Sequence, residues 1–232
     1  MPSGNVFHTV LQQVAMEIVD GRLEAGARLT LSDVEEKFGI SRTLARDVVK
    51  ALESVGLLVA KRRAGIQVLP KSQWSVLDAQ VIEWRLESDE KLAQITSLTE
   101  LRRGIEPMAA GLASQRRSDE QADQLVALAD DLKALGERGL GRSDKYLQTD
   151  IEFHSLLLEA SGNEMLIAMR GMIVEVLRGR SIHGLMPVTP EPGALLDHSR
   201  IAKAIAERDD VVAETVSRRQ MDGLQTELSS SG

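Results

Sequence analysis

Three side chains in the C-terminal half of the sequence are of the kinds that bind divalent metal ions. Asp150 and His154 lie four residues apart in a stretch with helical periodicity, so the carboxylate and the imidazole project from one helix face about one turn apart. His198 follows Asp197 near the start of a later helical stretch. The same spacing is more common in an exposed ion pair, and a lone histidine is more commonly structural. The residues alone therefore leave a metal site and a surface pair open.

A second group of side chains, in the N-terminal third, is suited to DNA. In one predicted helix Arg42, Arg46 and Lys50 recur at four-residue spacing, with Thr43 beside them and Ser41 as the helix cap. The opposite face of this helix is apolar and consists of Leu44, Ala45, Val48, Val49 and Leu52. Cationic and hydroxyl groups bond phosphate oxygens and the edges of bases. A core helix with a solvated charged face would show the same pattern.

Upstream of this helix, the sequence predicts the first half of a helix-turn-helix. Residues 30–38 are predicted to form a short helix capped by Thr30 or Ser32. Gly39 suits the tight turn between two helices. The order of helix, glycine turn and helix favours a DNA-reading motif over a plain core helix.

Downstream, the sequence predicts a β-hairpin. The runs 56–60 and 66–69 favour strands. They are joined by a basic tip that contains Lys61, Arg62, Arg63 and Gly65. A helix-turn-helix followed by such a hairpin is a winged helix, whose tip can lie along a phosphate backbone or enter the minor groove.

Length and composition predict a mainly α protein of two domains. The chain has 232 residues, and aromatic residues make up 3% of it, so its cores must be built from aliphatic side chains, which favours helices. We expect a winged helix-turn-helix domain at residues 1–70 and a linker at 71–77. An all-α helical bundle is expected at 78–232, with a kink or a break at Pro107.

The charge distribution predicts that the protein works as a homodimer. The net charge is −7, but residues 1–70 carry +1 and the remainder carries −8. DNA binding depends on the local patch, because charges beyond about 8–10 Å are screened at physiological salt. A weakly basic DNA-binding domain would bind double-stranded DNA with modest affinity as a monomer. We therefore expect a homodimer, which doubles the contacts and binds an inverted repeat.

The sequence also predicts a cytoplasmic location, at the nucleoid. There is no cysteine, which fits a reducing cytosol and excludes thiolate zinc sites. The first residues lack the basic and apolar segments of a signal peptide, and no run approaches the roughly 20 apolar residues of a membrane span. No membrane partner is expected.

Residues 7–70 resemble the winged-helix domain of the GntR family of bacterial transcription regulators. The matching positions are Ile18, Gly21, Leu23, Gly26, Leu29, Val34, residues 39–43, Arg46, Leu52, Gly56, Leu57 and Gly65. The resemblance implies that Ser41, Arg42, Thr43 and Arg46 contact DNA and that Gly65 lies at the wing tip. Many relatives carry an arginine just before the first motif helix; here the sequence is Leu31-Ser32-Asp33, so that contact is not expected.

The C-terminal part resembles the FCD effector domain of the FadR-like branch of that family. The matching motifs are residues 100–107, 150–154 with 160–163, and 197–205. Many members hold a divalent metal, commonly zinc, with an aspartate and three histidines. Asp150, His154 and His198 match three of these ligands, and Gln220 replaces the fourth.

The resemblance also implies a small carboxylate effector. Arg102 would pair with its carboxylate, for which a guanidinium fork is suited, and Arg178 is a second candidate. Because a carboxamide oxygen is a weaker zinc ligand than imidazole, Gln220 should lower metal affinity. Without a metal, Asp150, His154, His198 and Gln220 would bond effector hydroxyl groups directly.

These observations give three functional hypotheses. The first is a repressor of a sugar-acid (aldonate) or related carboxylate catabolic operon, released from its operator by the effector. The sugar-acid class is implied by residues 73–78 and 81–84, which resemble the linker of FadR-like regulators of sugar-acid catabolism; the two tryptophans there could equally fasten the two domains together. The second is a metal-dependent hydrolase, in which Asp150, His154 and His198 hold an ion that activates water. The third is an oligomerising scaffold without a ligand, which would have a dry, leucine-filled bundle centre.

Overall fold

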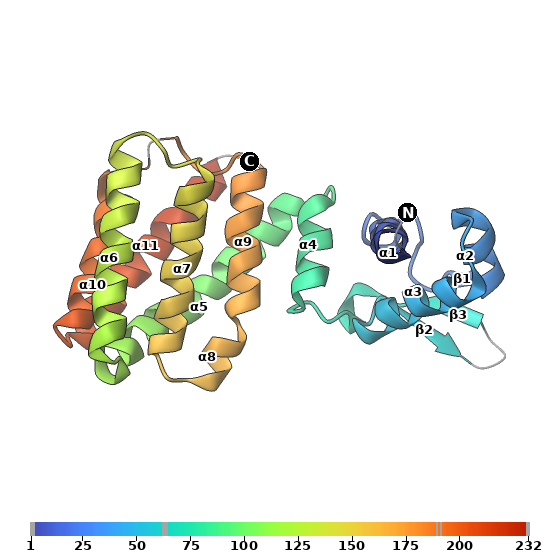
Figure 1. The fold of residues 1–232 in the computed structure, drawn as a ribbon, viewed down its shortest axis with the longest axis horizontal. Coiled ribbons are helices and arrows are strands. Elements are labelled where there is room, and N and C mark those ends of the chain that lie inside the picture. The colour runs from blue at the N-terminus through green and yellow to red at the C-terminus, as the bar shows by residue number, and fades with distance from the viewer. Residues whose placement is uncertain (1–2, 62–64, 189, 191, 231–232) are drawn as a thin grey trace. The chain divides into compact units, whose positions relative to one another are not determined.

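The structure, a computed structural model, describes residues 3–61, 65–188, 190 and 192–230. The chain divides into two compact units, residues 1–91 and 92–232. The first unit contains a small sheet, and the described part of the second contains helices but no strands (Figure 1). None of the described helices is both long enough and apolar enough to cross a membrane.

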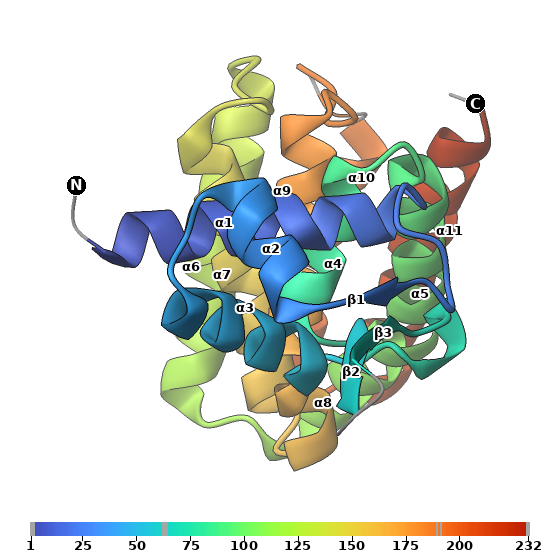
Figure 2. The same cartoon turned by 90° about the vertical axis from the view of Figure 1, so that its right-hand side faces the viewer.

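The N-terminal unit is a winged helix-turn-helix, as predicted. In chain order its elements are α1 (Ser3–Val19), β1 (Arg28–Leu29), α2 (Leu31–Phe38), α3 (Arg42–Ser54), β2 (Leu58–Lys61), β3 (Gly65–Val68), the 3-10 turn η1 (Lys71–Gln73) and α4 (Ala79–Glu87). The strands are antiparallel in the order β1-β3-β2 (Figure 2).

Local hydrogen bonds fix the ends of the two motif helices. Thr30 caps α2: its Oγ1 accepts from Asp33 N (3.1 Å), and Asp33 Oδ2 accepts from Thr30 N (2.7 Å). The helix ends at Gly39, whose φ of 62° lies in the left-handed region. Ser41 Oγ accepts from Leu44 N (3.3 Å) and starts α3. The predicted glycine turn and serine cap are confirmed.

The short strand β1 is absent from the sequence prediction. It pairs with β3 through Arg28 with Gln67 and Leu29 with Ile66. Gly65 begins β3 with a φ of 78°, and a Cβ atom there would lie 2.9 Å from the carbonyl oxygen of Leu29. Both the backbone conformation and the close approach of β1 therefore require glycine at this position.

Helix α4 packs in the N-terminal unit. Val81 and Trp84 are buried in the same apolar cluster as Val14 of α1 and Leu52 of α3, and Trp74 packs against that cluster. The two units consequently divide after Lys91, whereas the predicted second domain begins at residue 78. The difference arises because the apolar side chains of α4 complete the core of the reader.

The described part of the C-terminal unit is an all-α bundle, as predicted. Its helices are α5 (Lys91–Arg116), α6 (Asp119–Glu137), α7 (Asp144–Ala160), α8 (Glu164–Ala168), α9 (Arg170–Ile182), α10 (Pro192–Ala206) and α11 (Asp210–Ser230). Helix α5 continues through Pro107, so no break occurs there. Residues 164–182 form two helices, α8 and α9, which meet at Met169.

Candidate functional site

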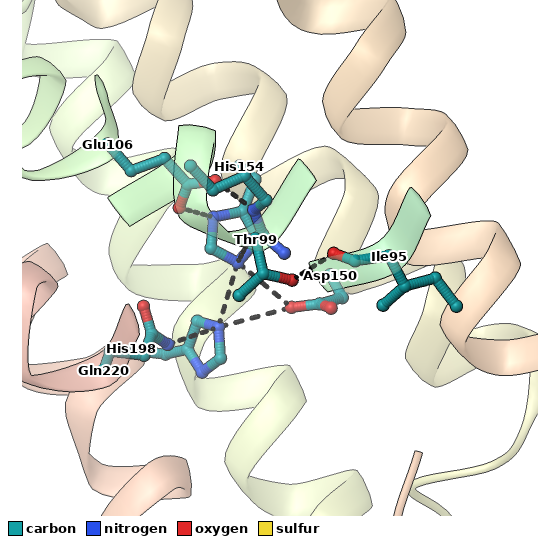
Figure 3. Close-up of polar contacts among 8 residues, drawn as sticks. Ile95, Thr99, Glu106, Asp150, His154, His198 and Gln220 are labelled. Carbon is teal, nitrogen blue, oxygen red and sulfur yellow. Dashed lines mark hydrogen bonds and ion pairs between the residues drawn. The ribbon is translucent and has the colours of Figure 1, made fainter. Parts of the chain in front are cut away.

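Polar side chains meet in the middle of the C-terminal bundle. They are Arg102 and Glu106 of α5, Asp150 and His154 of α7, His198 of α10 and Gln220 of α11, and all are buried. Figure 3 shows Asp150, His154 and His198 turned toward one another, with Glu106 on the other side of the His154 ring and the Gln220 amide beside His198. Buried charges are stable in a protein interior only when they are paired or bind an ion. This cluster is therefore the candidate site. A scaffold without a ligand would have an apolar, leucine-filled bundle centre, and these converging polar side chains do not fit that hypothesis.

Asp150, His154 and His198 place three metal-ligand atoms in a nearly equilateral triangle. Asp150 Oδ1 lies 3.4 Å from His154 Nε2 and 3.3 Å from His198 Nε2, and the two Nε2 atoms lie 3.4 Å apart. A tetrahedral zinc ion with bonds of about 2.0–2.1 Å holds its ligand atoms roughly 3.3–3.4 Å from one another. The three residues fit such an ion. Because Asp150 and His154 are buried, the alternative of an exposed surface pair is wrong.

Glu106 orients His154. Its Oε1 accepts from Arg102 Nε (2.5 Å), and its Oε2 lies 2.9 Å from His154 Nδ1, an ion-pair distance without the alignment of a full hydrogen bond. A carboxylate at Nδ1 favours a proton on that nitrogen and directs Nε2 toward Asp150 and His198. This is the arrangement of a carboxylate that supports a metal-binding histidine.

The charges of the cluster shift one another's pKa values. Burial raises the pKa of Glu106, but the charges of Arg102 and His154 more than offset it and lower that pKa to about 2. Burial also opposes ionisation of Asp150, yet hydrogen bonds from His154 and His198 hold its pKa well below the usual range. Burial lowers the pKa of His154, but Glu106 and Asp150 raise it to about 9. The raised pKa favours the protonated imidazole, so a metal at Nε2 must compete with a proton.

Gln220, which the family resemblance places at the fourth ligand position, lies beside His198. Its Nε2 lies 3.0 Å from His198 Nε2, and its Oε1 is buried without a hydrogen-bond partner among the described residues. A 180° rotation of the Gln220 amide group exchanges Oε1 and Nε2 and places the oxygen next to His198. This position therefore supplies either a weak oxygen ligand or a hydrogen-bonding group.

A cavity of about 490 Å³ opens onto the cluster within the C-terminal unit. Arg102, Asp150, His154, His198 and Gln220 all line it. Much of the remaining wall is apolar and includes Tyr146, Leu177, Met186, Pro187, Ala194 and Leu224. Small-molecule sites in proteins have volumes of roughly 300–1,000 Å³, so the cavity is large enough for a small ligand.

Arg102 lines the cavity, whereas Arg178 does not. Arg102 is fully buried; its Nη2 lies 3.4 Å from His154 Nε2, and its Nη1 has no hydrogen-bond partner in the described part of the chain. Arg178 is half-exposed, pairs with Glu175 and does not line the cavity. Arg180, two residues further along α9, is buried and does line it. Positions two apart on a helix face nearly opposite directions, which explains the difference.

Helix α3 presents the predicted DNA-reading face. Its buried residues are Ala45, Val48, Val49 and Leu52, and the residues exposed at its start and along its outer face include Ser41, Arg42, Thr43, Arg46 and Lys50. Arg42 forms an exposed ion pair with Glu35 (3.3 Å). Neither Arg42 nor Arg46 is buried, so both side chains are accessible to a phosphate or a base.

A groove of about 450 Å³ follows this face between α3 and the wing. The cationic residues that line it are Arg42, Arg46, Lys50 and Lys61, and Gly65 lies beside them. The predicted contacts of Arg62 and Arg63 lie outside the described residues. The two DNA-contacting segments expected of a winged helix, α3 and the hairpin, thus face one groove.

Two family models match the chain. The model of bacterial regulatory proteins of the gntR family matches residues 8–68, and the model of the FCD domain matches residues 97–223, more than half of the chain. The chain is a GntR-family regulator with an FCD domain. The first match covers the winged helix, and the second includes every member of the buried polar cluster.

Relatives of this GntR regulator match along most of their length. It is 28% identical over 202 residues to the galactonate operon transcriptional repressor of Escherichia coli K12, with 85% of this chain and 86% of that one covered. It is 28% identical over 208 residues to the uncharacterized HTH-type transcriptional regulator YieP of the same organism, with 88% and 87% covered. The solved structure of Streptococcus agalactiae GntR has the same fold, with a TM-score of 0.51, 24% identity and coverage of 95% and 99%.

Several residues that line the cavity of this regulator could not be singled out from the sequence. They are Tyr146, Arg180, Asp197, Arg200 and Arg219. Glu106, which contacts His154 without lining the cavity, was also not singled out. Glu106 has a detectable signal, because it lies four residues after Arg102 in a helix and so shares its face. Asp197 and Arg219 have none, because their contact joins two helices whose pairing the sequence does not specify.

Proposed function

We propose that this regulator is a homodimeric, operator-binding repressor that releases DNA when a small carboxylate binds the C-terminal cavity. The observation that carries the proposal is the buried guanidinium of Arg102, whose Nη1 lacks a partner among the described residues, beside the triangle of Asp150, His154 and His198. A buried donor without a partner costs about 1–3 kcal/mol. A ligand oxygen would remove that cost.

A divalent metal, with zinc as the first candidate, fits the site. Asp150, His154 and His198 would hold it, and Gln220 would complete the set weakly. When bound, the ion supplies Lewis-acid binding of carboxylate and hydroxyl oxygens. The alternative is that the same four side chains bond effector hydroxyl groups directly, with Arg102 paired to the carboxylate in either case.

A sugar acid of the aldonate class is the effector that we propose to test first. The galactonate operon repressor is a relative over most of both chains. An aldonate also has a carboxylate for Arg102 and an adjacent hydroxyl for the Asp150–His198 side of the cluster. Its size is compatible with the cavity.

We propose that the winged helix-turn-helix domains of two protomers bind DNA together. One recognition helix α3 per protomer enters the major groove, so that two protomers read an inverted repeat. Because half-sites must match the separation of the two recognition helices, an effector that changes this separation by a few ångströms lowers operator affinity.

The experiment uses duplexes that span the intergenic regions beside the gene. We expect purified protein to retard at least one of them far better than an unrelated duplex, and a panel of aldonates to include one that releases it. Failure to retard any of these duplexes at low salt would refute the reader assignment. Retardation without release or a calorimetric signal from any aldonate would refute the sugar-acid assignment alone.

The hydrolase hypothesis has less support. The family consists of transcription regulators. Glu106, the carboxylate that lies behind His154, is paired with two cations and has a pKa near 2, so it is a poor general base. Turnover of a sugar lactone by the zinc-loaded protein, lost in His154→Ala, would restore this hypothesis.

A further inference from the structure

The cavity has a second cationic group, separate from Arg102. Asp197 of α10 is buried and accepts from Arg219 of α11, at Oδ2 from Nε (3.2 Å) and at Oδ1 from Nη2. Arg200 Nη1 donates to the same Oδ1 (3.4 Å). All three residues line the cavity. Two guanidinium groups therefore share one carboxylate, and the group as a whole has a positive charge.

This group lies at the solvent end of the cavity. The side chains of Arg200 and Arg219 are 51% and 55% exposed, whereas that of Arg102 is 1% exposed. Arg102 thus marks the closed end and the other two arginines mark the opening. The cavity has a cationic donor at each end, with apolar wall residues such as Leu177 and Leu224 making up much of the rest.

The arginines at the opening retain hydrogen-bonding capacity. A guanidinium has five N–H donors. Asp197 accepts two from Arg219 and one from Arg200. A ligand with a single carboxylate, bound at Arg102, would leave the remaining donors to water. A ligand with a second anionic group at its far end would bond them with charge-assisted hydrogen bonds.

We infer that the effector carries two anionic groups, one bound at Arg102 in the closed end and one, a carboxylate or a phosphate, bound by Arg200 and Arg219 at the opening. The inference rests on the proposed function and narrows its small carboxylate to one with a second anionic group, so that an acid of this kind replaces the monoanionic aldonate as the first candidate. Guanidinium groups bind both carboxylate and phosphate through paired N–H donors. The competing explanation is that the Asp197–Arg219 contact only fastens α10 to α11.

The first test compares matched ligands by calorimetry on the full-length wild-type protein. D-Galactonate and galactarate differ only in a terminal carboxylate, D-gluconate and 6-phosphogluconate differ only in a terminal phosphate, and hexanoate and adipate form a pair without hydroxyl groups. We expect the dianion of at least one pair to bind roughly tenfold or more tightly than its monoanion.

The outcomes separate this inference from the proposed function. Equal affinity within every pair that binds, or tighter binding of the monoanion, overturns the inference and leaves the carboxylate effector intact. Preference for adipate, with no binding of the sugar acids, supports the inference and refutes the sugar-acid assignment. Absence of binding by all six ligands counts against both.

The second test replaces the proposed contact. Arg219→Gln should lower the affinity of the dianion severalfold, toward that of its monoanion, and leave the affinity of the monoanion unchanged. Arg218→Gln is the matched control, because Arg218 is half-exposed, pairs with Glu214 and does not line the cavity. Equal losses for both ligands in Arg219→Gln would identify a fastening role and overturn the inference. If circular dichroism shows that this variant is unfolded, Arg200→Gln takes its place, because Arg200 is the other proposed contact of the second anionic group. The ligand comparison on the wild-type protein tests the inference without any variant.

Discussion

At the residue scale, the charges of the buried polar cluster are arranged in opposite pairs. Arg102 is bonded to Glu106, and Glu106 and Asp150 flank His154 on its two ring nitrogens. Breaking a buried pair on one side costs about 3–5 kcal/mol, because the remaining charge has no partner. Arg102→Ala would therefore combine loss of the effector contact with loss of stability. Arg102→Lys, which keeps the charge and removes the forked donor, is the better probe of effector binding.

Glu106→Gln tests the role of the carboxylate behind His154. We expect zinc affinity to fall by about 10–100-fold, because loss of a supporting carboxylate weakens the histidine ligand. Competition with a chromophoric chelator measures the change. Glu100→Gln, an exposed position on the same helix, is the control and should leave the affinity unchanged. Equal zinc affinity in wild type and Glu106→Gln would contradict the orientation that we assign to His154.

Gln220→His tests the fourth position. Since Gln220 Nε2 lies 3.0 Å from His198 Nε2, an imidazole there should reach the same point and raise zinc affinity above that of the wild type. The same chelator competition shows the effect. A histidine that fails to raise the affinity would show that residue 220 does not face the ion.

The residues of the candidate site could be predicted where residue type, helical spacing and a family motif all indicate the same position. Asp150, His154 and His198 meet these conditions, and the structure brings them together. Arg178 and Arg180 show the limit: the periodicity of a helix does not fix its rotation well enough to decide which of two nearby arginines points inward. That rotation depends on the packing of α9 against α7.

At the element scale, the reader depends on turns that hold short helices and strands at fixed angles. Gly56, after α3, has a φ of 76°, and a Cβ atom there would lie 2.4 Å from the carbonyl oxygen of Gln73. Gly21, after α1, has a similar φ of 73° but open space around it. The two glycines thus share a backbone requirement and differ in close packing.

Alanine at these glycines separates the two requirements. Gly21→Ala should lower the free energy of unfolding by about 1 kcal/mol through the left-handed backbone alone. Gly56→Ala should cost about 1–3 kcal/mol more, because the backbone of η1 must move. Thermal unfolding followed by circular dichroism compares them. Equal losses in the two variants would show that the contact with Gln73 does not constrain the turn.

The recognition helix is tested by Arg46→Ala. Arg46 is exposed on α3 and lines the groove beside the wing, so its loss should weaken operator binding by about 1–3 kcal/mol per half-site. Fluorescence anisotropy with a labelled duplex gives the affinity. Arg22→Ala, at an exposed arginine paired with Asp20 outside α3, should have little effect. An equal loss of operator affinity in both variants would show that binding depends on the total positive charge and not on a contact of α3.

The elements of the reader could be predicted because capping and turn residues mark their ends locally. Thr30, Gly39 and Ser41 each act at the boundary where the sequence predicts them. Strand β1 has two residues and gives no periodic signal, so its pairing with β3 could not be predicted. The packing of α4 on the reader depends on contacts distant in sequence, which local patterns do not report.

At the scale of the whole molecule, the DNA-reading face and the effector cavity lie in different compact units. A ligand can change operator affinity only if it binds the DNA-bound and free forms with different affinities. The coupling must then be reciprocal: the factor by which the effector weakens operator binding equals the factor by which the operator weakens effector binding. Such reciprocal coupling between effector and operator is expected of a ligand-responsive regulator and is not expected of a scaffold that binds no ligand.

Calorimetric titration of the effector into the protein, with and without saturating operator duplex, tests the central claim most directly. Allosteric couplings are typically about 5–150-fold, so we expect the operator to weaken effector binding by a factor in that range, matched by the loss of operator affinity at saturating effector. Identical effector affinities in the two titrations would show that the cavity does not control the reader.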